Sequence, residues 1–191
     1  MSVLDFWLKN PLIVGGTFLV LMILDGILTK RNFILYKQKY ANFFEGELFE
    51  ANVLFQQVIH KDKPFQKWTY VSIGIFTIFA MAASWLLSES YSIWMVEFGL
   101  GAGFFILFDT FIDHIKSLFR FKFVKYHPES LKGKITLSKD FQFAILRQET
   151  FVDSFLLILI WIFIGRAFLL GGAFGLVLLS LTSLVWKSKT K

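Results

Sequence analysis

The stretch Leu24-Asp25-Gly26-Ile27-Leu28-Thr29-Lys30-Arg31-Asn32 ends the first long apolar segment of the chain. It places a carboxylate, Asp25, inside a segment that otherwise has the composition of a membrane span. A related pattern returns 84 residues later, where Asp109-Thr110-Phe111-Ile112-Asp113 precedes His114-Ile115-Lys116. Positions i, i+4, i+7 and i+11 share one face of a helix. Each segment therefore predicts a helix with a polar stripe: Asp25, Thr29, Asn32 and Tyr36 in the first, Asp109, Asp113, Lys116 and Arg120 in the second.

Composition indicates an all-α, polytopic membrane protein. The 191 residues are 55% apolar and only 18% charged, with a mean hydropathy of +0.60. The basic residues separate apolar segments rather than forming a folded basic face, so we expect a lipid bilayer and no nucleic acid as the partner. The chain has no cysteine, which excludes disulfides, thiolate metal sites and cysteine nucleophiles. Its 25 Phe and its preference for Lys over Arg fit an AT-rich, prokaryotic genome.

The apolar segments predict about five transmembrane helices within a single integral membrane domain, residues 1–191. The expected spans are 11–28, 68–87, 91–118, 151–165 and 167–186. The last 36 apolar residues, 151–186, would reach about 54 Å as one helix, against a hydrocarbon core of about 30 Å. They must therefore fold back, either at Gly165-Arg166 or at Gly171-Gly172. The first turn is favoured because it places Arg166 in water.

The distribution of Lys and Arg predicts the orientation in the cell membrane. Eighteen of the 20 basic residues fall in the two long loops, about 30–67 and 119–150, or at their edges and in the C-terminal tail. The N-terminus is therefore expected outside, with both loops and the C-terminus in the cytoplasm. Spans one and two would form one hairpin, and spans three and four another of the same orientation. With the matched polar stripes, this suggests a parallel repeat of two hairpins, plus a fifth helix.

The two long loops carry patterns of their own. Apolar residues recur at helical spacing over residues 43–59, which predicts an amphipathic helix at the membrane surface. The second loop shows strand-like alternation within residues 133–146, and the sequence does not decide its conformation. The alternating residues are Ile135, Leu137, Phe141 and Phe143.

The acids of the two stripes form the candidate site. Asp25 and Asp109 lie at similar depth in their spans and could face each other. With Asp113, Thr29 and Asn32 they would form an oxygen-rich pocket of the kind that Mg²⁺ or Ca²⁺ prefers, with Asp25, Asp109 and Asp113 as ligands. Without a cation, close carboxylates would instead hold a proton.

A structural interpretation of these polar residues stays open. Asp113 would then pair with Lys116, Asp25 would pair with a Lys or Arg of a neighbouring helix, and Thr29 would bond its own backbone. His114 lies off the Asp109 face and is interpreted as interfacial. Glu97, a second intramembrane acid, is interpreted as a polar contact between helices or as part of an ion path towards Asp109. Gly99-x-x-x-Gly103 and Gly171-x-x-x-Gly175 indicate close helix packing, within the chain, in a homo-oligomer or against a membrane partner.

One resemblance rests on the first third of the chain. Asp25-x-x-x-Thr29, followed by Glu50-Ala51-Asn52-Val53, is similar to a family of small uncharacterised prokaryotic multi-pass membrane proteins. Members carry an Asp-x-x-x-Thr span end and then a Glu-x-Asn-Pro segment; here Val53 replaces the proline. The resemblance implies no activity, but it adds Glu50 and Asn52 to the candidate binding residues.

Three functions fit these observations. The first is movement of a small solute or cation through the carboxylate site. The second is a membrane-embedded, metal-dependent enzyme acting on lipid head groups, and the third is a non-catalytic subunit or assembly factor. The chain lacks His-Glu-x-x-His, Gly-x-Ser-x-Gly and a phosphate-binding glycine loop, so we expect transport rather than catalysis.

Overall fold

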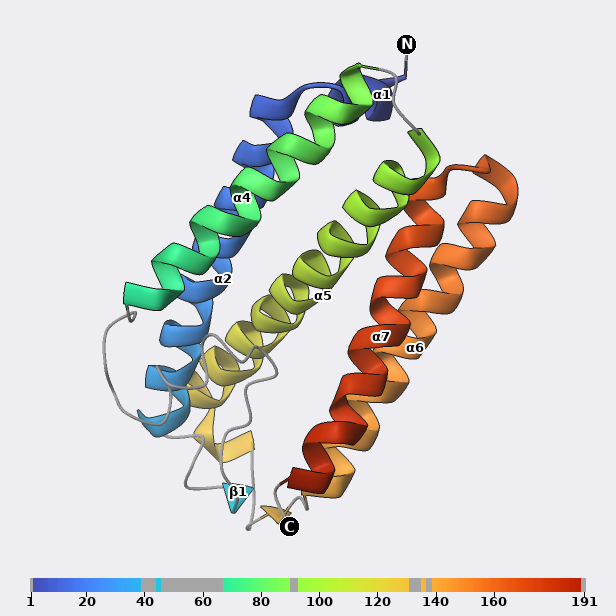
Figure 1. The fold of residues 1–191 in the computed structure, drawn as a ribbon. Helices are drawn as coiled ribbons and strands as arrows, with labels where there is room; N and C mark the ends of the chain where they lie inside the picture. The colour runs from blue at the N-terminus through green and yellow to red at the C-terminus, as the bar shows by residue number, and fades with distance from the viewer. Residues whose placement is uncertain are drawn as a thin grey trace.

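The computed structural model describes residues 2–38, 44–45, 67–89, 93–130, 135–136 and 139–189. Five long helices run side by side in this part of the chain (Figure 1). They are α2 (Pro11–Gln38), α4 (Lys67–Ser88), α5 (Ile93–Tyr126), α6 (Lys139–Ile164) and α7 (Ala167–Lys189). A short helix, α1 (Val3–Leu8), precedes them, and a single 3-10 turn, η2 (Pro128–Ser130), follows α5. The helical bundle expected from the sequence is confirmed.

Three of these helices are long and apolar enough to cross a membrane. They cover Pro11–Gln38, Tyr70–Ser88 and Trp94–Tyr126, and α7 adds a shorter apolar stretch, Ala167–Leu181. Large apolar side chains cover the outside of the bundle, including Phe79 at 75% and Phe163 at 88% exposure. Such a surface is compatible with lipid and costly in water.

The helices extend beyond the expected spans. α2 continues to Gln38 rather than ending near residue 28, α5 continues to Tyr126, and α6 begins at Lys139. Charged residues end the apolar segment without ending the helix, because Lys, Arg and Gln are themselves good helix formers. The extensions of α2 and α5 pack together: the rings of Tyr36 and Phe121 lie 5.9 Å apart. The last two helices are separated at Gly165, which has φ of +71°, and Arg166. The glycine pair 171–172, the other turn considered, lies inside α7.

The helices are packed in the order α4, α2, α5, α7, α6. α4 packs against α2, as a hairpin should, but α5 packs mainly against α2 and α7, and α6 packs mainly against α7. The expected repeat of two equivalent hairpins is therefore wrong. The fifth helix lies between the two members of the second expected hairpin, where small residues let it approach α5.

Glycines bring α5 and α7 into backbone contact. A Cβ atom on Gly101 would overlap the carbonyl group of Phe168, and one on Gly171 would overlap the carbonyl group of Phe98. A Cβ on Gly175 would lie 2.7 Å from the carbonyl oxygen of Ala102. The Gly171-x-x-x-Gly175 motif thus packs as expected. On α5, however, Gly101 makes this contact, and the space beside Gly99 is open.

Helix α1 closes one end of the bundle, called here the α1 end. The Ser2 side chain accepts a hydrogen bond from the Asp5 backbone, and the Asp5 carboxylate accepts one from the Ser2 backbone, which forms a capping box. The indole nitrogen of Trp7 donates to the Thr17 hydroxyl at 3.0 Å. The Ser84 hydroxyl donates to the carbonyl oxygen of Leu8 at 2.6 Å. α1 is therefore held against both α2 and α4.

The opposite end carries two short strands and is called the strand end (Figure 1). β1 (Phe44–Glu45) pairs in parallel with β2 (Ile135–Thr136), which joins the two loop segments. Phe44 and Glu45 were expected in an amphipathic helix, and this assignment is wrong, because their backbone pairs with β2. The rest of 43–59, including Glu50 and Asn52, lies outside the described residues. Of the alternating residues, Ile135 lies in β2, whereas Phe141 and Phe143 lie in α6.

Candidate functional site

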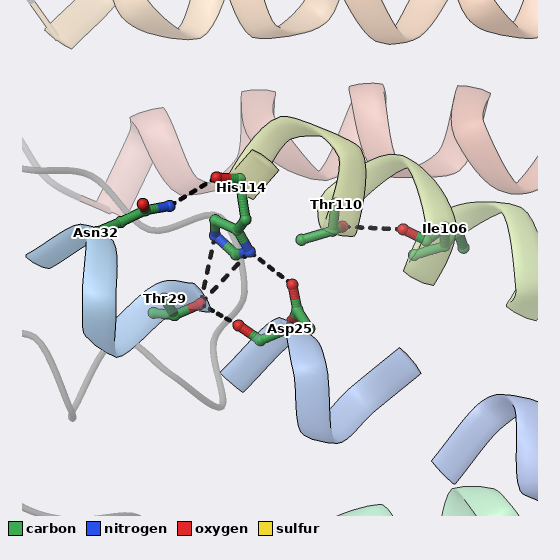
Figure 2. A network of polar contacts seen from close by, with 6 residues as sticks. All are labelled: Asp25, Thr29, Asn32, Ile106, Thr110 and His114. Atoms are coloured by element: carbon green, nitrogen blue, oxygen red, sulfur yellow. Dashed lines mark hydrogen bonds and ion pairs between the residues drawn. The ribbon is translucent and has the colours of Figure 1, made fainter. Parts of the chain in front are cut away.

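The main polar site lies between α2 and α5 (Figure 2). Nδ1 of His114, on α5, lies 2.6 Å from Oδ1 of Asp25, on α2. The Asp25 residue is 1% exposed, and the His114 side chain is 12% exposed. Buried charged groups are stable only when paired and hydrogen-bonded, so this contact accounts for a carboxylate inside the bundle.

Two further residues of the α2 stripe complete the network. The Thr29 hydroxyl donates to the Asp25 carbonyl oxygen at 2.9 Å, and its oxygen lies 3.4 Å from both ring nitrogens of His114. The Asn32 amide nitrogen donates to the carbonyl oxygen of His114 at 2.8 Å. Thr29 and Asn32 are 1% and 4% exposed. The three residues of the stripe predicted from the i, i+4, i+7 spacing therefore contact both the imidazole ring and the backbone of His114.

This network contains one acceptor with unused capacity. The side-chain oxygen of Asn32 is buried and has no hydrogen-bond partner in the part of the chain that the structure describes. Buried polar atoms are normally satisfied, if not by protein then by water or a ligand. A water molecule that donates to this oxygen, or a small cation that the oxygen coordinates, would complete this site.

A second polar site lies on the other side of α5. It contains Asp109, on α5, and Asp153, on α6. Both residues line a cavity of about 370 Å³ between α5, α6 and α7. Lys116 also lines this cavity, and its ammonium group lies 2.8 Å from Asp113.

The expected site of Asp25, Asp109 and Asp113 is not assembled. Asp109 and His114 are five residues apart on α5, so their directions differ by about 140° around the helix. Asp25 contacts His114, whereas Asp109 lines a cavity together with Asp153, and Asp113 pairs with Lys116. Among the described residues, no three His, Asp or Glu side chains converge as metal ligands would. The Mg²⁺ or Ca²⁺ site expected at these acids is therefore a wrong prediction.

A third polar cluster joins helices at the α1 end. Nε of Arg166 donates to Glu97 on α5 at 2.7 Å, and Nη1 donates to Asp5 on α1 at 2.6 Å. Hydrogen bonds from Arg166 and from Ser2 hold the pKa of the Asp5 carboxyl far below its ordinary value. Glu97 is 5% exposed and pairs with a cation there, so it makes the polar contact between helices that was expected of it.

Sequence reasoning missed three members of these sites. His114 was interpreted as interfacial, but it is the partner of Asp25; the stripe on α2 indicated that a partner existed, not which helix supplied it. Asp153 was overlooked, although it is an ionisable residue within an expected span and was recognisable on that basis. Asp5 was not among the candidate residues.

No family model, no curated protein and no solved structure matches this chain.

Proposed function

We propose that the protein moves protons, alone or with a small cationic solute, through the polar network between α2 and α5. One observation carries the proposal: a carboxylate and an imidazole lie 2.6 Å apart inside a bundle of apolar helices. Ionisable residues within membrane helices are costly and typically mark ion or proton pathways. Histidine is also the side chain that most readily gains and loses a proton near neutral pH.

The neighbouring groups support this proposal. The free acceptor of Asn32 leaves a place for a water molecule or a cation beside the stripe. The carboxyl groups of Asp109, on α5, and Asp153, on α6, line one cavity and provide a second proton-binding position. Together these groups distribute proton acceptors over both faces of α5.

The proposed arrangement in the membrane has five spans, formed by α2, α4, α5, α6 and α7. The N-terminus lies outside and the C-terminus lies in the cytoplasm, as the distribution of basic residues predicts. An odd number of spans places the two termini on opposite sides, and the ribbon places them at opposite ends of the bundle (Figure 1). Association with a second copy or another membrane protein is proposed only through glycines with open space, such as Gly99.

Flux in liposomes tests the function. The full chain is reconstituted with a pH-sensitive dye inside the vesicles, and a pH difference is imposed with a potassium potential as counter-charge. The parent protein should collapse the pH difference faster than protein-free vesicles do. His114→Gln and Asp25→Asn should each lose most of that flux, because each removes one titrating member of the pair.

A control variant separates this result from general damage. Glu129→Gln changes an exposed acid in η2, distant in sequence from the pair, and should retain the parent flux. If the parent conducts no faster than empty vesicles, with protons alone or with small cations added, the transport proposal is wrong. A non-catalytic subunit would then be the better interpretation.

A further inference from the structure

We propose that the cavity between α5, α6 and α7 binds an amphiphilic amine, with an ammonium head group and an unbranched alkyl body. This site is separate from the Asp25–His114 pair, and binding there does not depend on the proposed transport. The inference rests on the shape, lining and charge of the cavity.

Most of the cavity is apolar. Its volume of about 370 Å³ falls within the range of small-molecule sites. Leu157 and Leu176 form buried walls, and the other apolar lining residues are Phe105, Phe108, Ile112 and Leu156. An alkyl chain bound here would contact apolar side chains, and moving it out of water into such surroundings is favourable.

The polar lining is concentrated in Asp109, Asp153 and Lys116. A second cavity of about 340 Å³ shares Lys116 and Asp153 with the first and adds Glu149. Lys116 is already paired with Asp113 at 2.8 Å, so its charge is largely compensated. The remaining acids, Asp109, Asp153 and Glu149, give the two adjoining cavities an excess of negative charge, which favours a cation.

An ammonium group fits this chemistry better than other head groups. It has three N–H donors and no acceptor, and Asp109 and Asp153 offer only carboxyl oxygens. An anionic head group would meet like charge, and a neutral alcohol would offer a single donor. Charge-assisted hydrogen bonds are also roughly twice as strong as neutral ones.

Calorimetric titration of the full chain in detergent tests the inference, with octylamine as the probe and protein-free detergent as the blank. The parent should bind octylamine, and octanol and octanoate should bind roughly tenfold more weakly or not at all. Shortening the amine should weaken binding by about fourfold for each methylene removed. Asp153→Asn should weaken octylamine binding by roughly tenfold.

Two further variants make the result specific. Leu156→Trp places a larger ring at a partly exposed position of the cavity wall and should reduce binding without removing a charge. Glu129→Gln removes an acid outside both cavities and should bind as the parent does. Asp25→Asn should also still bind octylamine, which separates this site from transport. Equal affinity for octylamine and octanol, or unchanged affinity in both Asp153→Asn and Leu156→Trp, would overturn the inference.

Discussion

His114 and Asp25 explain each other at the level of single residues. Each would be costly alone among apolar helices, and a contact of 2.6 Å between them offsets that cost. Removing one member leaves the other buried without this partner. The free energy of unfolding should therefore respond to the pair rather than to each residue separately.

A double-mutant cycle measures this coupling. Asp25→Asn and His114→Gln are compared singly and together by unfolding in mixed micelles. The double variant should depart from the sum of the single effects by about 0.5–3 kcal/mol, because the residues are in contact. As the control, Asp25→Asn combined with Glu129→Gln should be additive within about 0.5 kcal/mol. Additive effects in the first cycle would show that the contact contributes no stability.

Asp5 gives a prediction about pH at the α1 end. Its pKa is held far below the ordinary value of 3.8, first by the hydrogen bond from Arg166 and then by those from Ser2. A group whose pKa is lowered by folding stabilises the folded state above its ordinary pKa and loses that contribution as the pH falls. The other charged residues that line the small cavity beside Asp5 are Lys9, Glu97 and Arg166.

The melting temperatures of the parent and of Asp5→Asn should therefore differ by a constant amount between about pH 5 and pH 8. Below about pH 4 the difference should shrink, because the parent also loses the carboxylate. A difference that grows as the pH falls would contradict the assignment. So would a difference that appears only above neutral pH.

At the level of helices, glycine positions determine which elements pack. Gly101 and Gly171 meet backbone carbonyl groups across the α5–α7 contact, and backbone cannot move aside as a flexible side chain can. Gly171→Ala should therefore destabilise the protein by roughly 1–3 kcal/mol or more, from overpacking. Gly99→Ala faces open space and should be neutral or stabilising by up to about 1 kcal/mol, since alanine favours the helix.

Unfolding of the two variants in the same micelles checks this prediction. The comparison is informative because both glycines belong to a Gly-x-x-x-Gly motif, whereas only Gly171 lies against the backbone of another helix. If Gly99→Ala were the damaging change and Gly171→Ala the harmless one, the packing of α5 on α7 would be wrong.

The same helices show what the sequence could and could not predict. Apolar length identified the segments that become the long helices, and the excess length of 151–186 required a turn, which lies at Gly165 and Arg166. The rotation of each helix about its axis was not accessible in the same way. In lipid, apolar side chains are favourable both inside and outside the bundle, so hydrophobic periodicity does not mark the inner face. For that reason Asp25 and Asp109 were expected together, although the residue of α5 that contacts Asp25 is His114 and not Asp109.

At the level of the whole molecule, the polar groups divide the bundle into regions with different roles. Asp5, Glu97 and Arg166 join α1, α5 and the α6–α7 turn at one end. The Asp25–His114 pair lies further along, between α2 and α5. Asp109 on α5 and Asp153 on α6 line the cavity between α5, α6 and α7. The cluster at the α1 end fixes helix positions. Among the described residues, the network between α2 and α5 contains an acceptor without a partner, and the site of Asp109 and Asp153 contains a cavity. This contrast is the reason for assigning structure to the first and function to the others.

The orientation of the bundle gives the last prediction. The chain has no cysteine, so one introduced cysteine can be labelled without background. Ser88 is exposed at the end of α4, and Ser130 is exposed in η2, which follows α5 towards the strand end. With the N-terminus outside, a membrane-impermeant maleimide should label Ser88→Cys in intact cells. It should label Ser130→Cys only after the membrane is permeabilised. Labelling of both positions from the same side would contradict a bundle that crosses the membrane along its long axis. The reversed result would keep the bundle but invert the orientation that the basic residues predict.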